Sequence, residues 1–147
     1  MKIDATSIAL IKQLRQGRAS VKKIARTLKL AENTVRARIA KLEADGVLEV
    51  VGLVDPQKLP HHRVVMVGVK LAVMDLVKKG AEFSKLKGVV SVSVVTGRFD
   101  LILTVLLKDG FGLLEFYTEE VTRVTEVQSV ETFVVYKSYN LKVPYIL

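Results

Sequence analysis

The first fifty positions place apolar residues at helical spacing between polar ones. Asp4 precedes such a stripe and Gly17 follows it; the stripe consists of Leu10, Ile11 and Leu14. A carboxylate accepts hydrogen bonds from the free N–H groups at the start of a helix, whereas glycine commonly ends one. The pattern therefore predicts a first helix that begins after Asp4 and ends near Gly17.

Two more helices are predicted before residue 50. Ser20 is a candidate cap for the second helix, whose inner face would consist of Ile24, Ala25 and Leu28. After a tight connector at residues 29–31, a third helix is predicted from about Glu32 to Ala44, with Gly46 just beyond it. Its apolar positions have i, i+4, i+7 spacing and are Val35, Ile39 and Leu42. This succession is typical of a helix-turn-helix unit.

The third helix separates its side chains when they are placed about 100° apart. The side opposite the apolar stripe holds small or amide residues, namely Asn33, Ala37, Ala40 and Ala44. The flanks carry Arg36 on one side and Thr34 with Lys41 on the other. Small residues let a helix approach a groove floor, Asn33 can pair with an adenine edge, and the cations can reach phosphates or guanine. Arg38 lies nearer the buried edge, where a structural or phosphate-positioning role comes first.

The second half of the chain has the period of β-strands. Strand patterns occupy residues 64–73, 89–97, 101–107 and 130–139. The first pattern places four apolar residues on one face: Val65, Val67, Val69 and Leu71. The second alternates Val90, Val92 and Val94 with Ser91, Ser93 and Val95. The third is apolar on both faces.

Helical spacing separates the first strand from the second and the third from the fourth. Residues 75–87 carry Leu76, Phe83 and Leu86 at helical positions. Asp109 is a candidate cap for a helix that carries Phe111, Leu114, Tyr117, Val121 and Val124. The order β-α-β-β-α-β predicts a ferredoxin-like antiparallel sheet with two helices on one face, so the fold class is α+β.

This arrangement leaves one face of the sheet without a cover. Because the first and third strands are apolar on both faces, a monomer would expose an apolar patch of several hundred Å², which is unusual. We therefore expect a homodimer that packs sheet on sheet. Burial of this face by the chain's own N-terminal half is the alternative.

The distribution of charge indicates what kind of partner the N-terminal half binds. The 147-residue chain has a net charge of +8. Residues 1–60 contain 12 Lys and Arg against 6 Asp and Glu, and between Arg15 and Lys41 nine cations accompany a single acid, Glu32. A one-signed basic segment on a helical pattern predicts a polyanion binder, here double-stranded DNA. An ordinary solvated surface is the alternative.

The sequence lacks the residues that metal binding, disulfide bonding and enzymatic catalysis usually require. With no cysteine, the sequence excludes a disulfide scaffold, a thiolate metal site and a cysteine nucleophile. The only histidines, His61 and His62, are adjacent in an extended segment, which favours a surface role over a metal site. No phosphate loop, HExxH motif or supported catalytic triad is found, so we expect no enzymatic activity, cofactor or metal. Neither a signal peptide nor a membrane span is visible, and a cytoplasmic protein is expected.

An ordered set of motif positions runs through the first sixty residues: Ser20-x-x-x-Ile24-Ala25, Leu30, Thr34-Val35-x-x-Arg38-Ile39-x-x-Leu42-Glu43-x-x-Gly46-Val47-Leu48 and Leu53-Val54-Asp55-Pro56-x-x-Leu59. This set resembles the DNA-binding half and hinge of the Lrp/AsnC (feast/famine) transcription regulators. The resemblance implies an N-terminal winged helix-turn-helix at 1–48, a hinge at 49–62, and a ligand-sensing and oligomerisation domain at 63–147. One departure is Ala31, where the family usually has serine, which removes a helix cap worth about 1 kcal/mol.

Pattern and resemblance together nominate nine residues for contact with DNA. Base reading is assigned to Asn33, Thr34 and Arg36, and salt-dependent attraction to the basic residues. The complete set is Arg18, Ser20, Lys22, Lys23, Asn33, Thr34, Arg36, Arg38 and Lys41.

The turn between the second and third strands reads Thr96-Gly97-Arg98-Phe99-Asp100-Leu101. It is similar to the family's Gly-x-aromatic-Asp ligand-domain signature, which implies an effector site for an amino acid or related small molecule. The resemblance implies Gly97, Phe99, Asp100, Glu131 and Thr132 as effector residues, and Arg98 joins them because, beside Asp100, it would suit a zwitterion. The alternatives are an ordinary hairpin and, for Arg98, a surface ion pair.

The expected function is a sequence-specific, DNA-binding transcription regulator that a small molecule modulates. A dimer would present two recognition helices to successive major-groove faces, and tetramers or octamers would extend it. Two alternatives remain. One is an enzyme subunit of the sirohaem decarboxylase type, whose members resemble this family; the other is an architectural protein that binds DNA without sequence preference.

Overall fold

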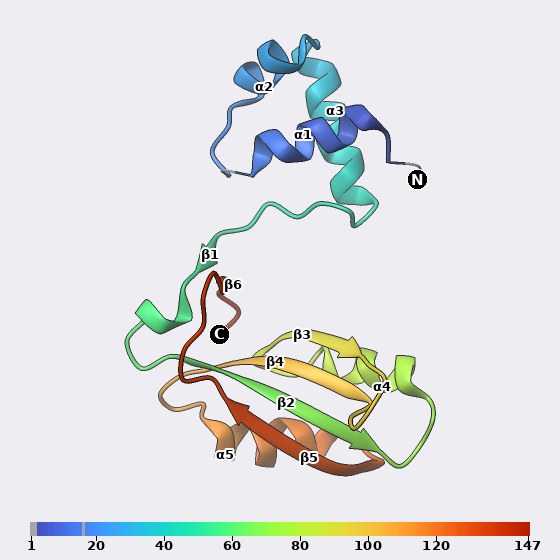
Figure 1. The fold of residues 1–147 in the computed structure, drawn as a ribbon, viewed down its shortest axis with the longest axis vertical. Coiled ribbons are helices and arrows are strands. Elements are labelled where there is room, and N and C mark those ends of the chain that lie inside the picture. The colour runs from blue at the N-terminus through green and yellow to red at the C-terminus, as the bar shows by residue number, and fades with distance from the viewer. Residues whose placement is uncertain (1–2, 16) are drawn as a thin grey trace. The chain divides into compact units, whose positions relative to one another are not determined.

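The computed structural model describes residues 3–15 and 17–147, and these form two compact units, Met1–Val51 and Gly52–Leu147 (Figure 1). The chain passes from one unit to the other inside the segment 49–62 that was predicted as the hinge. Each unit has its own buried core.

The first helix of the N-terminal unit, α1, spans Ala5–Leu14. The carboxylate of Asp4 accepts a hydrogen bond from the Ser7 N–H at 2.7 Å, and the Gly17 N–H donates to the Leu14 carbonyl at 2.8 Å. Gly17 has a φ of +70°, which a residue without a Cβ adopts readily. The predicted start and end of α1 are therefore confirmed.

Helices α2 (Val21–Leu28) and α3 (Glu32–Ala44) complete this unit. The Ser20 hydroxyl caps α2 by accepting from the Lys23 N–H at 3.2 Å, as predicted, whereas Ala31 precedes α3 without a side-chain cap. The core that the three helices share consists of Leu10, Ile24, Ala25, Val35 and Leu42. Within residues 3–15 and 17–51 there is no strand, so the wing implied by the resemblance does not form a β-hairpin there.

The second unit contains a four-stranded antiparallel sheet in the order β3-β4-β2-β5. Its strands are β2 (Arg63–Leu71), β3 (Val89–Val94), β4 (Leu101–Leu107) and β5 (Val127–Val134). Helix α4 (Leu76–Phe83) joins β2 to β3. A second helical segment joins β4 to β5, and it consists of α5 (Leu113–Glu115), the π-helix η2 (Phe116–Glu120) and the 3₁₀ turn η3 (Val121–Arg123). Both helical segments cover one face of the sheet (Figure 1). The predicted α+β, βαββαβ order is confirmed.

The covered face of the sheet is the core of this unit. The β2 residues predicted to share a face are all buried there and meet Phe83, Phe116 and the inward residues of β4; they are Val65, Val67, Val69 and Leu71. Alternate residues of a strand point to opposite faces. The other face of β2 therefore carries Met66, Gly68 and Lys70.

Strand β3 differs from its predicted pattern. It ends at Val94 rather than at Gly97, because the Val95 N–H closes the following turn by donating to the Asp100 carbonyl at 3.0 Å. A register shift between Val89 and Ser91 also interrupts the predicted alternation. A bulge of this kind takes Val90 out of the sheet pairing.

The last predicted strand, residues 130–139, is displaced. Strand β5 begins at Val127 and ends at Val134, which pairs with Val65 close to the start of β2. Arg63 and Val64 of β2 pair with β4 but not with β5, and the chain leaves the sheet after Val134. It returns as β6 (Val143–Pro144), which pairs with β1 (Leu53–Val54).

The β1–β6 pair was not predicted, and it changes the uncovered sheet face. A small buried cluster of Val64, Leu106 and Val143 joins this face to the C-terminal segment. The chain thus covers one end of the sheet by itself. The exposed remainder is smaller than the pattern of β2 and β4 indicates.

The predicted cap at Asp109 is wrong. Helix α5 begins after Gly112, and the Gly112 N–H donates to the Glu115 carboxylate at 2.8 Å. Asp109 instead lies in the tight turn between Lys108 and Phe111, which exchange two backbone hydrogen bonds. The residue predicted to cap the helix thus belongs to the turn that follows β4.

Candidate DNA interface and effector loop

The outer face of α3 is exposed along its length. Val35 and Leu42 are buried, while the residues assigned to base and phosphate contact lie in solvent: Asn33, Thr34, Arg36 and Lys41. The small residues between them, Ala37, Ala40 and Ala44, are exposed as well. The predicted separation of the helix into an inner and an outer face is confirmed.

Arg38 differs from the other nominated residues because it is tied to α1. Its guanidinium donates to both carboxylate oxygens of Asp4, at 3.0 and 2.9 Å, and to the Ser7 hydroxyl at 3.3 Å. The pKa of Asp4 is lowered to about 2, first by the hydrogen bond from the Ser7 N–H, then by the Ser7 hydroxyl and by Arg38. Arg38 thus holds α3 against the start of α1, which agrees with the structural role expected first for this residue.

A hollow of about 650 Å³ lies beside the outer face of α3. Asp4 and Ser7 form one wall, and the other consists of α3 residues that include Asn33, Thr34, Ala37 and Lys41. The Arg38–Asp4 pair therefore borders the surface that would face a base edge. The pair therefore fixes the start of α1 at the edge of that surface.

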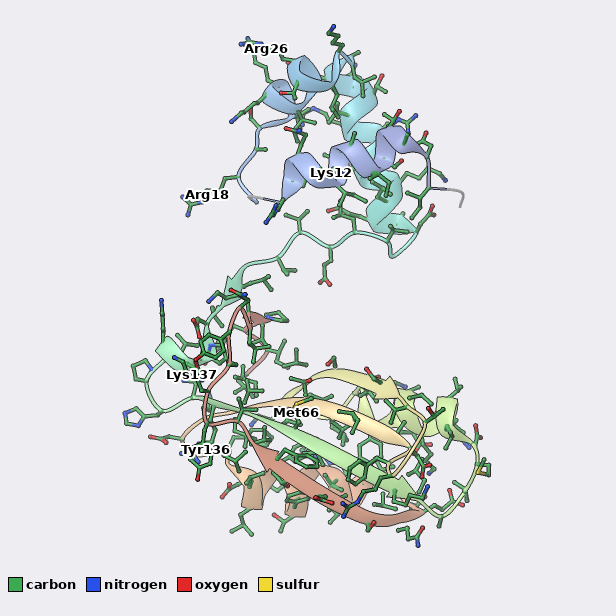
Figure 2. The ribbon with its side chains drawn as sticks, viewed as in Figure 1. Lys12, Arg18, Arg26, Met66, Tyr136 and Lys137 are labelled. Carbon is green, nitrogen blue, oxygen red and sulfur yellow. The ribbon has the colours of Figure 1, made fainter. Side chains whose placement is uncertain are left out.

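The cations of α1 and α2 form a second part of the basic surface. Arg18, Lys22 and Lys23 are exposed, as the nomination required. Three further exposed cations, Lys12, Arg15 and Arg26, were not nominated, and Figure 2 shows Arg26 projecting from α2 and Arg18 from the loop between α1 and α2. Among residues 3–15 and 17–51, ion pairs involve only the cations Arg38 and Lys41.

Lys12, Arg15 and Lys23 line a shared hollow of about 380 Å³ between the end of α1 and the start of α2. Sequence reasoning did not nominate Lys12 and Arg15, because they belong to the end of α1 and not to the recognition helix. The signal that could have found them is the run of cations that begins at Lys12. The hollow brings three positive charges together where a phosphate can be bound.

In the second unit, Asp100 holds the predicted effector turn onto β2. Its carboxylate accepts from the Leu71 N–H at 2.8 Å and from the Lys70 ammonium at 2.8 Å. The Leu71 hydrogen bond, and then Lys70, lower the pKa of Asp100. Both carboxylate oxygens are therefore engaged within the protein.

Phe99 lies on the sheet face that the helices leave uncovered. Its ring sits over Gly68, where an added Cβ would be 2.7 Å from the ring, and it meets Phe133 edge-on at 5.9 Å between centroids. Arg98 pairs with Glu131 at 2.8 Å, with its guanidinium 5.4 Å from the Phe99 ring centre. The fold thus brings Arg98, Phe99 and Glu131 together.

Thr132 does not join this group. It pairs with Val67 of the covered face, and its hydroxyl hydrogen-bonds Tyr117 of η2. Neighbouring residues of a strand point to opposite faces, so Thr132 lies on the helix-covered face of the sheet and Glu131 on the uncovered face. Gly97 lies in the turn itself with a φ of +119°. The six nominated effector residues therefore do not share one surface.

The histidines lie in the segment that leads into β2. His61 pairs with Asp109 at 3.2 Å between Nδ1 and the carboxylate, and His62 contacts the Pro60 carbonyl and the Tyr145 hydroxyl. In the part of the chain that the structure describes, no three His, Asp or Glu side chains gather as a metal-binding group. None of the described helices is long and apolar enough to cross a bilayer.

Fold and surface together define a class of protein. A helix-turn-helix unit with an exposed, basic recognition helix precedes a ferredoxin-like domain, which is the organisation of a two-domain DNA-binding regulator. Family models make this specific: the AsnC-type helix-turn-helix domain matches residues 3–43, and the Lrp/AsnC ligand-binding domain matches residues 64–143. The chain belongs to the Lrp/AsnC family.

Individual relatives agree with this assignment. The chain is 30% identical over 131 residues to the HTH-type transcriptional regulator LrpA1 of Halobacterium salinarum, covering 86% of this chain and 91% of that protein. The crystal structure of PH0061 has the same fold, with a TM-score of 0.80, 24% identity, and coverage of 97% and 98% of the two chains. The regulator NMB0573 of Neisseria meningitidis, solved as an L-Met complex, has a TM-score of 0.71, 21% identity, and coverage of 99% and 96%.

Proposed function

We propose that this protein is a sequence-specific regulator of transcription that binds double-stranded DNA through the outer face of α3. The observation that carries the proposal is the exposure of Asn33, Thr34 and Arg36 on a helix whose opposite stripe is buried. An amide and a guanidinium are the groups that recognise adenine and guanine edges in the major groove. The unpaired cations around α2 would position the helix on the phosphates.

The protein would act as a homodimer through the uncovered face of its sheet. Met66 is 40% exposed and Phe133 is 43% exposed, and the two are directly paired across β2 and β5. Apolar side chains at the centre of a sheet are usually covered. A second copy would bury them and present two α3 helices, as a two-fold DNA site requires. Tetramers or octamers would need further contacts.

An amino acid is the effector class that the second unit supports. The Neisseria protein was solved with L-Met, and the Arg98–Glu131 pair offers one cation and one anion side by side. A zwitterion matches such a pair if its carboxylate meets Arg98 and its ammonium meets Glu131. Binding would shift the population of dimer arrangements and hence the spacing of the α3 helices.

The test of the DNA proposal is an affinity measurement with matched variants. Sites would be selected from random DNA, and binding of selected and random duplexes would be followed by fluorescence anisotropy over a salt series. Arg36→Ala is expected to cost about 1–3 kcal/mol on the selected site and to reduce its advantage over random DNA. Lys22→Ala should weaken both duplexes alike and flatten the salt dependence by roughly one unit.

Lys85→Ala is the control, because Lys85 is exposed in the second unit. Equal affinity for selected and random duplexes in the parent protein would favour the architectural alternative. No affinity for DNA at low salt would reject both DNA proposals. An absorbance change on addition of a haem-type ligand would support the enzymatic alternative.

A further inference from the structure

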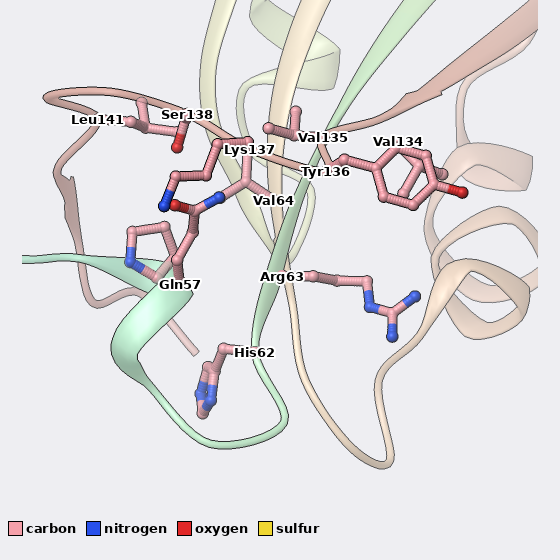
Figure 3. Close-up of a pocket in the computed structure, with 11 residues that line it drawn as sticks. Gln57, His62, Arg63, Val64, Val134, Val135, Tyr136, Lys137, Ser138 and Leu141 are labelled. Carbon is pink, nitrogen blue, oxygen red and sulfur yellow. The ribbon is translucent and has the colours of Figure 1, made fainter.

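A cavity of about 470 Å³ lies where the C-terminal segment passes the start of β2 (Figure 3). Its walls come from three places in the second unit: the 3₁₀ turn η1 (Pro56–Lys58), the first residues of β2, and residues 134–141. Cavities that hold small ligands have volumes of roughly 300–1,000 Å³. The size of this one suits a compact metabolite.

The charged groups of the cavity wall are of one sign. Arg63 and Lys137 belong to the wall together with His62, and none of the eleven lining residues is an Asp or Glu. In the described chain neither Arg63 nor Lys137 has an ion-pair partner, although the Lys137 ammonium lies 5.8 Å from the Tyr139 ring centre. The positive charge at this cavity is not compensated.

The two acids closest in sequence to the wall are already engaged. Asp55 accepts from the Lys142 ammonium at 2.8 Å, which lowers the pKa of Asp55, and Glu131 is paired with Arg98 at 2.8 Å. Neither carboxylate lines the cavity. An anion that entered would therefore find donors without an internal competitor.

The neutral part of the wall suits a small organic body. Gln57 and Ser138 supply an amide and a hydroxyl, while Val64 and Leu141 supply apolar contact. Figure 3 shows Arg63 and Tyr136 on one side of the opening and Gln57 with Lys137 on the other. The charged ends of Arg63 and Lys137 point away from each other in this view, so each would meet a different part of a bound molecule.

We propose that this cavity binds a small organic anion through a phosphate or carboxylate group. The site is separate from the turn at residues 97–100. Arg63 and Lys70 mark opposite ends of β2, and seven residues of strand at about 3.3 Å each put the two regions roughly 23 Å apart. The cavity joins η1, which lies within the predicted hinge at 49–62, to the C-terminal segment that β6 holds against β1. Its ligand would brace these two segments.

Isothermal titration calorimetry on the full-length protein at low ionic strength tests this proposal. The probes are inorganic phosphate, adenosine 5′-monophosphate and succinate, which separate free phosphate, a nucleotide and a carboxylate. At least one probe should bind, with amide shifts at residues 135–138 in a parallel NMR titration. The double variant Arg63→Gln, Lys137→Gln should bind that probe about tenfold more weakly or worse.

The double variant Lys78→Gln, Lys85→Gln removes the same amount of charge from exposed sites on the other side of the domain fold and should bind like the parent. Absence of binding by all three probes would overturn the proposal. Equal weakening by both double variants would overturn it too, because a general charge effect would then suffice. Loss of DNA affinity in the Arg63, Lys137 variant, with no probe binding to the parent, would assign these cations to DNA instead.

Discussion

Two residues of this protein make contacts that the motifs they belong to do not predict. Asp100 belongs to a turn that resembles a ligand signature, yet its carboxylate is occupied by Leu71 and Lys70. Arg38 belongs to the recognition helix, yet it is bound to Asp4. In both cases the residue type was predicted to matter, but its partner lies about thirty positions away. Sequence spacing alone does not identify such long-range partners.

The Asp4 carboxylate should make stability depend on acid pH. Its pKa is about 2 in the folded protein and 3.8 in a model peptide, so its charge stabilises the fold above pH 4 and this contribution is lost as the pH falls through 2. Asp4→Asn keeps a capping side chain but removes the charge. The variant should be less stable than the parent near neutral pH, and the gap should close toward pH 2, as measured by urea unfolding at each pH.

A gap that does not change between pH 6 and pH 2 would show that the charge of Asp4 contributes nothing. Glu43→Gln is a suitable control, because Glu43 is an exposed acid of the same unit. Its unfolding curves should follow those of the parent at every pH. The comparison isolates the Arg38–Asp4–Ser7 contact from general acid effects.

Gly68 and Phe99 form a tight contact that can be tested as a pair. A Cβ at Gly68 would lie 2.7 Å from the Phe99 ring, so Gly68→Ala must displace the ring and should cost about 1–3 kcal/mol of unfolding free energy. In a Phe99→Ala background the same change should cost clearly less. Chemical denaturation of the four proteins in this double-mutant cycle provides the measurement. Additive costs would mean that the ring is not held over Gly68.

At the scale of elements, prediction succeeded where the signals are local. The bounds of α3 follow from a 3.6-residue pattern and the caps of α1 and α2 from single polar residues, and all appear where expected. It failed where an element depends on a distant segment. The bounds of β5 depend on its pairing with β2 between Val65 and Leu71, and the β1–β6 pair joins residues about ninety positions apart.

The missing cap of α3 predicts a stabilising substitution. Ala31 has the extended backbone of an N-cap residue, with φ −68° and ψ 145°, but its side chain accepts no hydrogen bond. Ala31→Ser should therefore increase the unfolding free energy by about 0.5–1 kcal/mol. Hydrogen exchange of the first α3 amides would report this gain directly. Ala44→Ser, at the other end of the helix, should give no such gain, and equal protection in the two variants would contradict the capping argument.

At the scale of the whole molecule, the uncovered sheet face and the DNA proposal depend on each other. Reading a two-fold site needs two α3 helices held by one assembly, and the exposed Met66 and Phe133 offer the surface for it. The C-terminal segment covers only the Val64 and Leu106 end of this face. The central part remains open for a second copy.

Met66→Asp should consequently produce a monomer. A carboxylate at the centre of an apolar interface would be desolvated without a partner, which costs several kcal/mol and outweighs the burial of the surrounding side chains. Sedimentation velocity should show the parent as a dimer or a multiple of it and the variant at half that mass or less. Affinity for a two-fold duplex should fall with it, while affinity for random DNA at low salt should fall much less, because each monomer keeps its basic surface.

Val77→Asp is the matched control, since Val77 is 79% exposed on α4, in the helical layer of the same unit. A Met66→Asp protein that keeps the parent's mass would place the dimer contact elsewhere, and the exposed sheet face would then need another explanation.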